Sequence, residues 1–336
     1  MMKNRLMKGL LAAIVALLAT QAHAGQEVTV YTAFETDMLA KYKVAFEKEN
    51  PDIEIKWVRD STGIMTAKLL AEQNNPRAEV VWGLAGSSMA LLKDKGILKP
   101  YTPAGVEALR PSLNDPQSGQ AWYGNDAFFN AVCFNDIVAK QLNLPKPTSW
   151  EDLTKPIYKG HIAMPNPASS GTGYMQVSAW LQNMGEDQAW DYMRKLDNNI
   201  AHYTHSGSKP CVQAGMGEVA IGISMATRGA KLKTQGAPLS VILPKGIGWE
   251  SEAVGLVKPS AAAKRVVDWS VSKNANQLYI ESYPVVGHKD VSKKVANYPD
   301  VDKSMAKMDF ARMGSERASV LKTWSDKFDS KSEPKS

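Results

Sequence analysis

A regular alternation of short apolar strands with amphipathic helices begins at residue 28 and constrains the fold of this chain more than any other feature. Apolar strands are expected at residues 28–31, 53–57 and 79–82, and a helix is expected after each of them. Strands that alternate with helices in this way usually form a parallel sheet with helices packed on its faces. The first part of the chain therefore predicts an α/β lobe.

The same alternation continues through the middle of the chain. Further strands are expected at residues 130–134, 161–164, 218–223 and 239–243. Helices are expected to open at the capping sequence of residues 148–151, at Ser170 and at Ala261. The length of 336 residues is enough for two domains, and no repeat or long low-complexity linker divides the chain. We therefore expect two α/β lobes joined by short crossovers.

The N-terminus has the pattern of an export signal. Basic residues within the first eight positions are followed by an apolar run over residues 10–19 and by Ala22-His23-Ala24, which is typical of a cleavage site. The apolar run is too short to span a bilayer core of ~30 Å, so a membrane anchor is disfavoured. We expect residues 1–24 to be a signal peptide and the mature chain to begin at Gly25.

Charge and cysteine content narrow the possible partners. The formal net charge is +6, but the basic residues are scattered along the chain without a continuous run, so nucleic-acid binding is not expected. Cys133 and Cys211 are the only cysteines. In an oxidising compartment they could form a disulfide, or both could be small buried core residues, and the sequence leaves both states open.

Sequence motifs of catalysis are absent. The chain contains no G-x-S-x-G elbow, no phosphate-binding P-loop, no H-E-x-x-H and no C-x-x-C. His202 and His205 could hold a metal if they lay on one helix, but their segment has the pattern of a strand and a turn. A secreted hydrolase would need an activated nucleophile or a metal cluster, and neither is visible. We therefore expect a protein that is not an enzyme and has no metal or other cofactor.

Segments rich in hydroxyl groups and glycine stand where strands end and helices begin. They are Ser61-Thr62-Gly63, Gly86-Ser87-Ser88, Ser169-Ser170-Gly171-Thr172-Gly173 and Ser206-Gly207-Ser208. Any one of them could be an ordinary N-cap, but together they would bring unpaired backbone N–H groups and positive helix ends around one pocket. The residues expected to bind an oxyanion are Thr62, Ser87, Ser170, Gly171, Thr172 and Ser206.

Two acidic residues lie beside these segments in the sequence. Glu35 directly follows the first strand, and Asp126 lies just before the strand expected at residues 130–134. Either could be an ordinary surface carboxylate or helix cap. In a closing pocket, however, a carboxylate would repel a pure anion and would favour the ammonium group of a zwitterion. We expect Glu35 and Asp126 to bind an amine, with Glu250 and Glu252 as the next candidates.

Several of these stretches are similar to the type II periplasmic solute-binding proteins of ABC importers, in the branch that includes Fe(III) binders. The stretches that carry the resemblance are Val28-Thr29-Val30-Tyr31-Thr32-Ala33-Phe34-Glu35 and residues 78–83, 167–173 and 217–222. The resemblance implies a two-lobed α/β fold in which each lobe is a mixed sheet flanked by helices and the ligand lies in the interlobe cleft. It implies that residues 127–249 form a second lobe, inserted into a first lobe of residues 25–126 and 250–336.

The resemblance also has consequences for the ligand. Iron binders carry an adjacent Tyr-Tyr pair where this chain has Ser-Met-Ala-Thr-Arg at residues 224–228, and Glu35 stands at their first-strand His position. Within the branch, the chain looks most like the 2-aminoethylphosphonate-binding proteins, whose ligand combines a phosphonate with an ammonium group. Fe(III), another oxyanion such as sulfate, thiamine and polyamines remain the alternatives. The resemblance implies a periplasmic monomer that delivers its ligand to a permease of the inner membrane without chemistry.

Overall fold

The computed structural model describes residues 25–334. The signal peptide expected at residues 1–24 lies outside the described residues. Among the helices that the structure describes, none combines the length and the hydropathy that crossing a membrane requires.

The N-terminal part of the chain builds a parallel sheet with a helix after each strand. Its strands are β1 (Gln26–Thr32), β2 (Ile53–Arg59) and β3 (Val80–Ala85). Its helices are α2 (Thr36–Glu49), α3 (Thr62–Ala71) and α4 (Gly86–Asp94). β1 lies between β2 and β3 and pairs with both in parallel. The strands and helices predicted for this part are confirmed, and Glu35 holds the N-cap position of α2.

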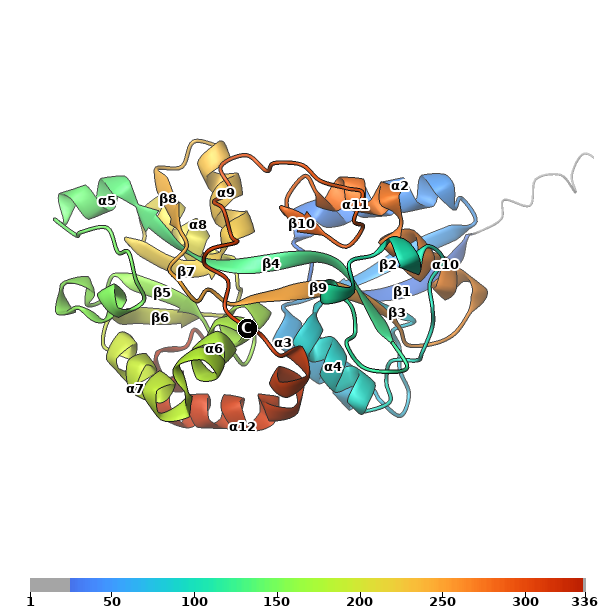
Figure 1. The fold of residues 1–336 in the computed structure, drawn as a ribbon, viewed down its shortest axis with the longest axis horizontal. Coiled ribbons are helices and arrows are strands. Elements are labelled where there is room, and N and C mark those ends of the chain that lie inside the picture. Colours follow the sequence, from blue (N-terminus) through green and yellow to red (C-terminus); the bar gives the residue numbers. More distant parts are fainter. Residues whose placement is uncertain (1–24, 335–336) are drawn as a thin grey trace, which may run out of the picture.

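Two long strands run through the middle of the molecule and join its halves (Figure 1). They are β4 (Trp122–Asn135) and β9 (Trp249–Leu256). The first part of β4, as far as Phe129, pairs with β9, and the part from Asn130 onward pairs with strands of the other half. β9 also pairs with β3, so it ties the first sheet to β4. The two halves therefore share one continuous set of hydrogen-bonded strands.

The middle of the chain builds the second half. Its strands are β5 (Ile162–Pro165), β6 (Ile200–Thr204), β7 (Ile221–Met225) and β8 (Leu239–Ile242). Its helices are α5 (Asp136–Gln141), α6 (Gly171–Met184), α7 (Glu186–Asp197), α8 (Lys209–Met216) and α9 (Ala226–Thr234). β5 pairs in parallel with β6 and β7, and β7 pairs antiparallel with β4, so this sheet is mixed.

The C-terminal part returns to the first half and then spans both. Its elements are α10 (Ala261–Val271), α11 (Lys273–Tyr279), β10 (Val285–Val286) and α12 (Phe310–Phe328). β10 pairs with β4, while α12 packs against α4 of the first half and α7 of the second (Figure 1). We propose that the first lobe consists of residues 25–126 and 250–336 and the second of residues 127–249. Close to these boundaries β4 changes its pairing partner from β9 to β7, and β9 begins at Trp249.

Two predicted elements differ from the observed ones for local reasons. The capping sequence at residues 148–151 opens only a 3-10 turn at Glu151–Thr154, because Lys155 precedes a proline and is extended. The strand predicted at residues 218–223 begins only at Ile221. The preceding residues close α8, with Gly217 in the left-handed conformation.

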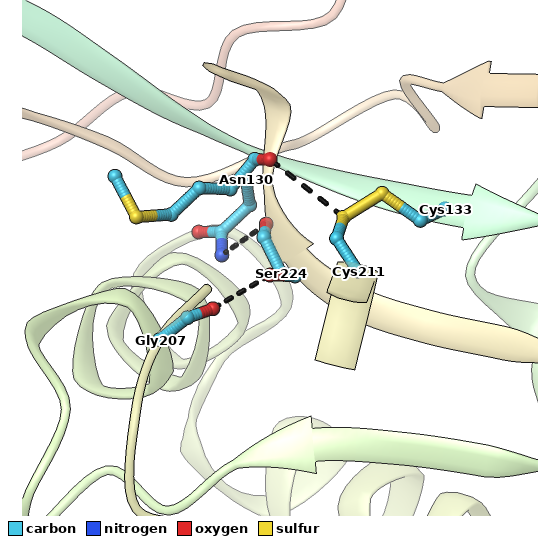
Figure 2. Close-up of a disulfide and its surroundings, with 6 residues drawn as sticks. Asn130, Cys133, Gly207, Cys211 and Ser224 are labelled. Atoms are coloured by element: carbon cyan, nitrogen blue, oxygen red, sulfur yellow. Dashed lines mark hydrogen bonds between the residues drawn. A yellow bond between two sulfur atoms is a disulfide. The ribbon is translucent and has the colours of Figure 1, made fainter. Parts of the chain in front are cut away.

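A disulfide joins Cys133 of β4 to Cys211 of α8, which answers the question that the sequence left open. The two cysteines are fully buried among Ala163, Val219 and other apolar side chains. Figure 2 shows how close this bond lies to the turn before α8, where the Ser224 hydroxyl donates to the Gly207 carbonyl at 2.6 Å. The disulfide therefore fixes α8 directly behind one of the hydroxyl-rich segments.

Candidate functional site

A pocket lies between the two halves, where the N-terminal ends of helices from both sides meet. Its empty volume is about 360 Å³. Its lining residues are Ala33, Glu35, Arg59, Ser61, Thr62, Phe128, Ser170, Gly171, Thr172, Ser206, Gly207, Met225 and Glu252. Neither half forms the pocket alone, because these residues come from β2, α3, β4, α6, β7, β9 and the turns before α2, α3, α6 and α8.

The two halves touch at one wall of this pocket. The backbone N–H of Gly63 donates to the Ser169 carbonyl at 2.9 Å, which joins the first turn of α3 to the segment before α6. Gly171 packs so closely against Thr62 that an added Cβ atom would lie 2.8 Å from the threonine side chain. The lobes are therefore closed on each other in this structure.

Of the residues predicted to bind an oxyanion, Thr62, Ser170, Gly171, Thr172 and Ser206 line the pocket together. Ser170 is the N-cap of α6, and its hydroxyl accepts from the Gly173 N–H at 3.3 Å. The hydroxyls of Thr62 and Thr172 make no hydrogen bond with any residue that the structure describes. The pocket wall thus offers free hydroxyl groups beside two positive helix ends, which is the arrangement that binds oxyanions.

Ser87 is not brought to this pocket. It lies in the first turn of α4, is buried, and donates its backbone N–H to Oε2 of Glu250 at 2.8 Å. Glu250 comes from β9 and is itself fully buried, and burial raises the pKa of this carboxyl to about 7. The N-terminus of α4 therefore already has an acidic partner from within the chain.

Glu35 lines the pocket but is paired within the protein. One oxygen of its carboxylate accepts from Arg228 of α9 at 2.6 Å and from the Ser208 hydroxyl at 3.3 Å. Arg228 also lies 3.6 Å from Asp37, and Lys231 of α9 pairs with Asp37 as well. These ion pairs join the start of α2 in the first half to α9 in the second.

Asp126 lies behind the pocket wall. It is fully buried on β4, directly opposite Glu252 of β9 in the strand register. Glu252 lines the pocket, whereas Asp126 does not. Burial is the main reason that the pKa of Asp126 is well above its usual value, and burial also raises the pKa of Glu252 to about 7.

Arg59 is a charged lining residue that was not among the predicted site residues. It ends β2, two residues before Ser61, and its Nε donates to the Phe34 carbonyl at 3.1 Å. Its position was detectable in principle, because the carboxyl ends of neighbouring parallel strands meet at one edge of a sheet. Arg59 adds a positive charge to a pocket whose other polar groups are hydroxyls, backbone N–H groups and the carboxyl groups of Glu35 and Glu252.

His202 and His205, which were considered as metal ligands, do not lie on one helix. His202 lies on β6, and its Nε2 is 3.0 Å from the Gln213 amide oxygen. Within residues 25–334, no group of three or more His, Cys, Asp or Glu side chains is arranged to hold a metal ion.

Replacing Arg228 with Met is expected to weaken ligand binding by roughly fivefold. The Glu35 and Arg228 side chains are only 16% and 17% exposed, so their ion pair is worth more than a surface pair, about 1 kcal/mol. It forms only when the halves close, and its loss therefore disfavours the closed state in which ligand is held. Titration calorimetry of the parent and the variant at low and high salt measures this effect.

Lys233→Met is the matched control for this experiment. Lys233 lies on the same helix, is exposed, and makes no ion pair with the residues that the structure describes. The control should bind like the parent protein. Equal affinities of the Arg228 variant, the Lys233 variant and the parent would show that these ion pairs do not contribute to closure.

Comparisons of the sequence with known proteins show its similarity to bacterial extracellular solute-binding proteins. A family model described as bacterial extracellular solute-binding protein matches residues 75–306. An uncharacterized protein of Haemophilus influenzae is 30% identical over 276 residues, which cover 80% of this chain and 79% of that protein. A probable ABC transporter periplasmic-binding protein of Sinorhizobium fredii, y4fP, is 31% identical over 148 residues, covering 43% of this chain and 40% of y4fP. The phosphoglycerate transport regulatory protein PgtC of Salmonella typhimurium is 27% identical over 180 residues, covering 52% of this chain and 43% of PgtC.

Two of the solved structures of similar shape are described as periplasmic binding proteins, AfuA and P5PA. AfuA from Actinobacillus pleuropneumoniae, with fructose-6-phosphate bound, is 28% identical, with a TM-score of 0.85 over 91% of this chain and 99% of AfuA. The periplasmic binding protein P5PA is 23% identical, with a TM-score of 0.83 over 90% of this chain and 99% of P5PA. Iron-bound HitA from Pseudomonas aeruginosa is 19% identical, with a TM-score of 0.74 over 89% of this chain and 99% of HitA. The prediction of a two-lobed α/β fold is confirmed, and the last two structures bear on the fold alone.

Proposed function

This chain belongs to the bacterial extracellular solute-binding protein family, and we propose that it is the periplasmic component of an ABC importer that binds 2-aminoethylphosphonate. Its partners would be this small ligand and, transiently, a permease of the inner membrane. The family and the similar structures consist of binding proteins, which supports a role in transport rather than in catalysis.

The observation that carries the proposal is the set of hydroxyl groups at the N-termini of α3 and α6 in one interlobe pocket. Thr62 comes from the first half, and Ser170 and Thr172 come from the second. A phosphonate placed between them would accept hydrogen bonds from both halves and from the free N–H groups of the two helix ends. Such a ligand would hold the halves together, which is the closure that a transport receptor needs.

The charges in the pocket support a zwitterion. Arg59 on the wall favours an anionic group, whereas Glu35 and Glu252 would repel a ligand that is only anionic. A molecule with a phosphonate at one end and an ammonium at the other could place its anionic end near Arg59 and its cationic end near the carboxyl groups.

A sugar phosphate is the second candidate. The similar structure of AfuA, at 28% identity, contains fructose-6-phosphate. A phosphate would use the same hydroxyl groups as a phosphonate, and sugar hydroxyls could donate to Glu35 or Glu252. An Fe(III) ligand has less support, because the iron-bound neighbour at 19% identity is similar in fold only.

Thr172→Val is expected to weaken phosphonate binding by roughly tenfold. Its hydroxyl is free in this structure, and a hydrogen bond to a charged oxyanion contributes about 1.5–3 kcal/mol. Valine keeps the shape of the side chain, so the fold should be unaffected. Ser178→Ala, farther along α6 and outside the pocket, is the control. Equal calorimetric affinities of the Thr172 variant and the parent would remove this hydroxyl from the site.

Thermal unfolding of the protein with a panel of compounds tests the proposed function. The panel is 2-aminoethylphosphonate, ethylphosphonate, fructose-6-phosphate and ferric citrate. A bound ligand stabilises by about 2.7 kcal/mol at a hundredfold excess over Kd. We expect the greatest stabilisation with 2-aminoethylphosphonate and no product from any compound. Stabilisation by fructose-6-phosphate alone would select the second candidate, and product formation would contradict a binding role.

A further inference from the structure

Two buried carboxyl groups face each other at the back of the pocket. Asp126 of β4 and Glu252 of β9 are register partners on the two strands that join the lobes. Directly opposite side chains on antiparallel strands are close enough to interact. Asp126 is fully buried and Glu252 is 6% exposed, with Glu252 in front, at the pocket wall.

These carboxyl groups have no cationic partner in contact: Glu252 interacts through hydrogen bonds with the Tyr283 hydroxyl and with Asp126. Apart from these interactions, both oxygens of Asp126 and Oε2 of Glu252 have no hydrogen-bond partner among the described residues. Neither group makes an ion pair within the described part of the chain. Two ionised carboxylates can only accept hydrogen bonds, so they would repel each other, whereas one shared proton lets one donate to the other.

The surroundings of the pair are mostly uncharged. Arg59 is a cation whose charge acts on Glu252 through space, and the two side chains do not form an ion pair. The phenol groups nearby are all protonated at neutral pH, because burial raises the pKa of each. The groups that face the pair are Tyr42 of α2, Tyr279 of α11, Tyr283, Tyr298, Arg59 and Glu35.

We infer that Asp126 and Glu252 together form a cation subsite that shares one proton in the free protein and loses it when a ligand ammonium group binds. The inference rests on the proposed function, because the phosphonate must place the amine beside Glu252. On binding, the O–H bond of the protonated carboxyl breaks, its proton passes to the solvent, and the ammonium N–H groups donate to the carboxylate.

Glu35 is the less suitable amine acceptor. Its carboxylate already accepts from Arg228 at 2.6 Å, so a ligand ammonium would have to compete with a guanidinium group for it. Glu252 has a free oxygen and an unpaired acidic neighbour behind it. Binding an ammonium there supplies the positive charge that this buried pair lacks.

The experiment is titration calorimetry at about pH 7 in buffers of different ionisation enthalpy, which counts the protons released per ligand bound. The ligands are 2-aminoethylphosphonate and ethylphosphonate, which share the phosphonate group but differ in the amine. The variants are Asp126→Asn, Glu252→Gln and the control Glu250→Gln, a buried carboxyl on the same strand that faces Ser87 instead.

We expect the parent and Glu250→Gln to release about one more proton per 2-aminoethylphosphonate bound than Asp126→Asn does, because the protonation of the ligand itself cancels in this comparison. Asp126→Asn should bind the amino ligand with little of this extra proton, because the amide N–H group introduced there can donate to the Glu252 carboxylate and favour its ionised form, whereas in the parent the two carboxyl groups share a proton. Glu252→Gln should lose about tenfold or more of its preference for the amino ligand.

The results that would overturn the inference are of two kinds: one leaves the proposed function standing, and the other overturns it as well. Tight binding of 2-aminoethylphosphonate without the extra proton, or with the same proton release in Asp126→Asn, would overturn the subsite and leave the proposed function standing. Failure of both phosphonates to bind would overturn the function and, with it, the inference.

Discussion

Gly63→Ala is expected to weaken ligand binding by roughly tenfold to a hundredfold while leaving the protein folded. An added Cβ atom at Gly63 would lie 2.1 Å from the Ala168 carbonyl oxygen and 2.7 Å from that of Ser169. These are backbone atoms of the opposite lobe, so they cannot rotate away. Overpacking typically costs about 1–3 kcal/mol, and here the cost falls only on the closed state.

The open state should tolerate this change. Gly63 is the second residue of α3, and alanine is favoured over glycine inside a helix by about 1 kcal/mol. Small-angle scattering should therefore show a more open protein at saturating ligand, with an unchanged or higher unfolding temperature. Gly215→Ala in α8 is the control, because its Cβ would meet no atom nearer than 3.6 Å. If Gly63→Ala binds ligand as tightly as the control, close contact of the lobes at this point is not required.

Removal of the disulfide should produce the largest loss of stability. Cys133 and Cys211 are separated by 78 positions, and the entropy of closing a loop of that length corresponds to roughly 4–5 kcal/mol as an upper value. Alanine at both positions keeps the apolar surroundings. The urea midpoint, followed by tryptophan fluorescence, should fall markedly in the double alanine variant and in the reduced parent protein.

The disulfide prediction has an internal control. A reductant should destabilise the parent and should have no further effect on the double alanine variant. Ligand affinity should fall only modestly, because the Ser224 hydroxyl still fixes the Gly207 carbonyl beside the pocket. Equal urea midpoints for the parent and the double variant would contradict a stabilising role for this bond.

Local patterns predicted most of the fold. The spacing of apolar residues, the helix-capping residues and the positions of Gly and Pro each determine structure over only a few residues. The start of α3 at Thr62 and the start of α6 at Gly171 could therefore be predicted from the hydroxyl and glycine residues there. The exception at residues 148–151 was also local: a capping signal was present, but Pro156 prevents the helix from continuing.

Pairings between distant parts of the chain could not be predicted in this way. Ser87 has the same local pattern as Thr62, yet its N–H groups face Glu250, which lies 163 positions later. In the same way, Arg228 approaches Glu35 only because the lobes close. No local pattern contains this information, since it depends on how β9 returns between β3 and β4.

The positions of the acidic residues at the pocket also depend on pairing between distant strands. The sequence indicated that Asp126 could bind an amine, and the structure places it behind Glu252 rather than at the pocket surface. This relation is set by the register of β4 and β9, which includes a bulge just before Asp126. A shift of one position would turn one of the two side chains to the other face of the sheet.

A crystal structure of the protein with 2-aminoethylphosphonate tests the central claim most directly. The proposed function predicts the phosphonate oxygens within hydrogen-bond distance of Thr62 and Thr172, one from each lobe, and the ammonium group beside Glu252. A ligand bound outside the interlobe pocket, or bound there with its ammonium group against Thr62 and Thr172, would contradict it.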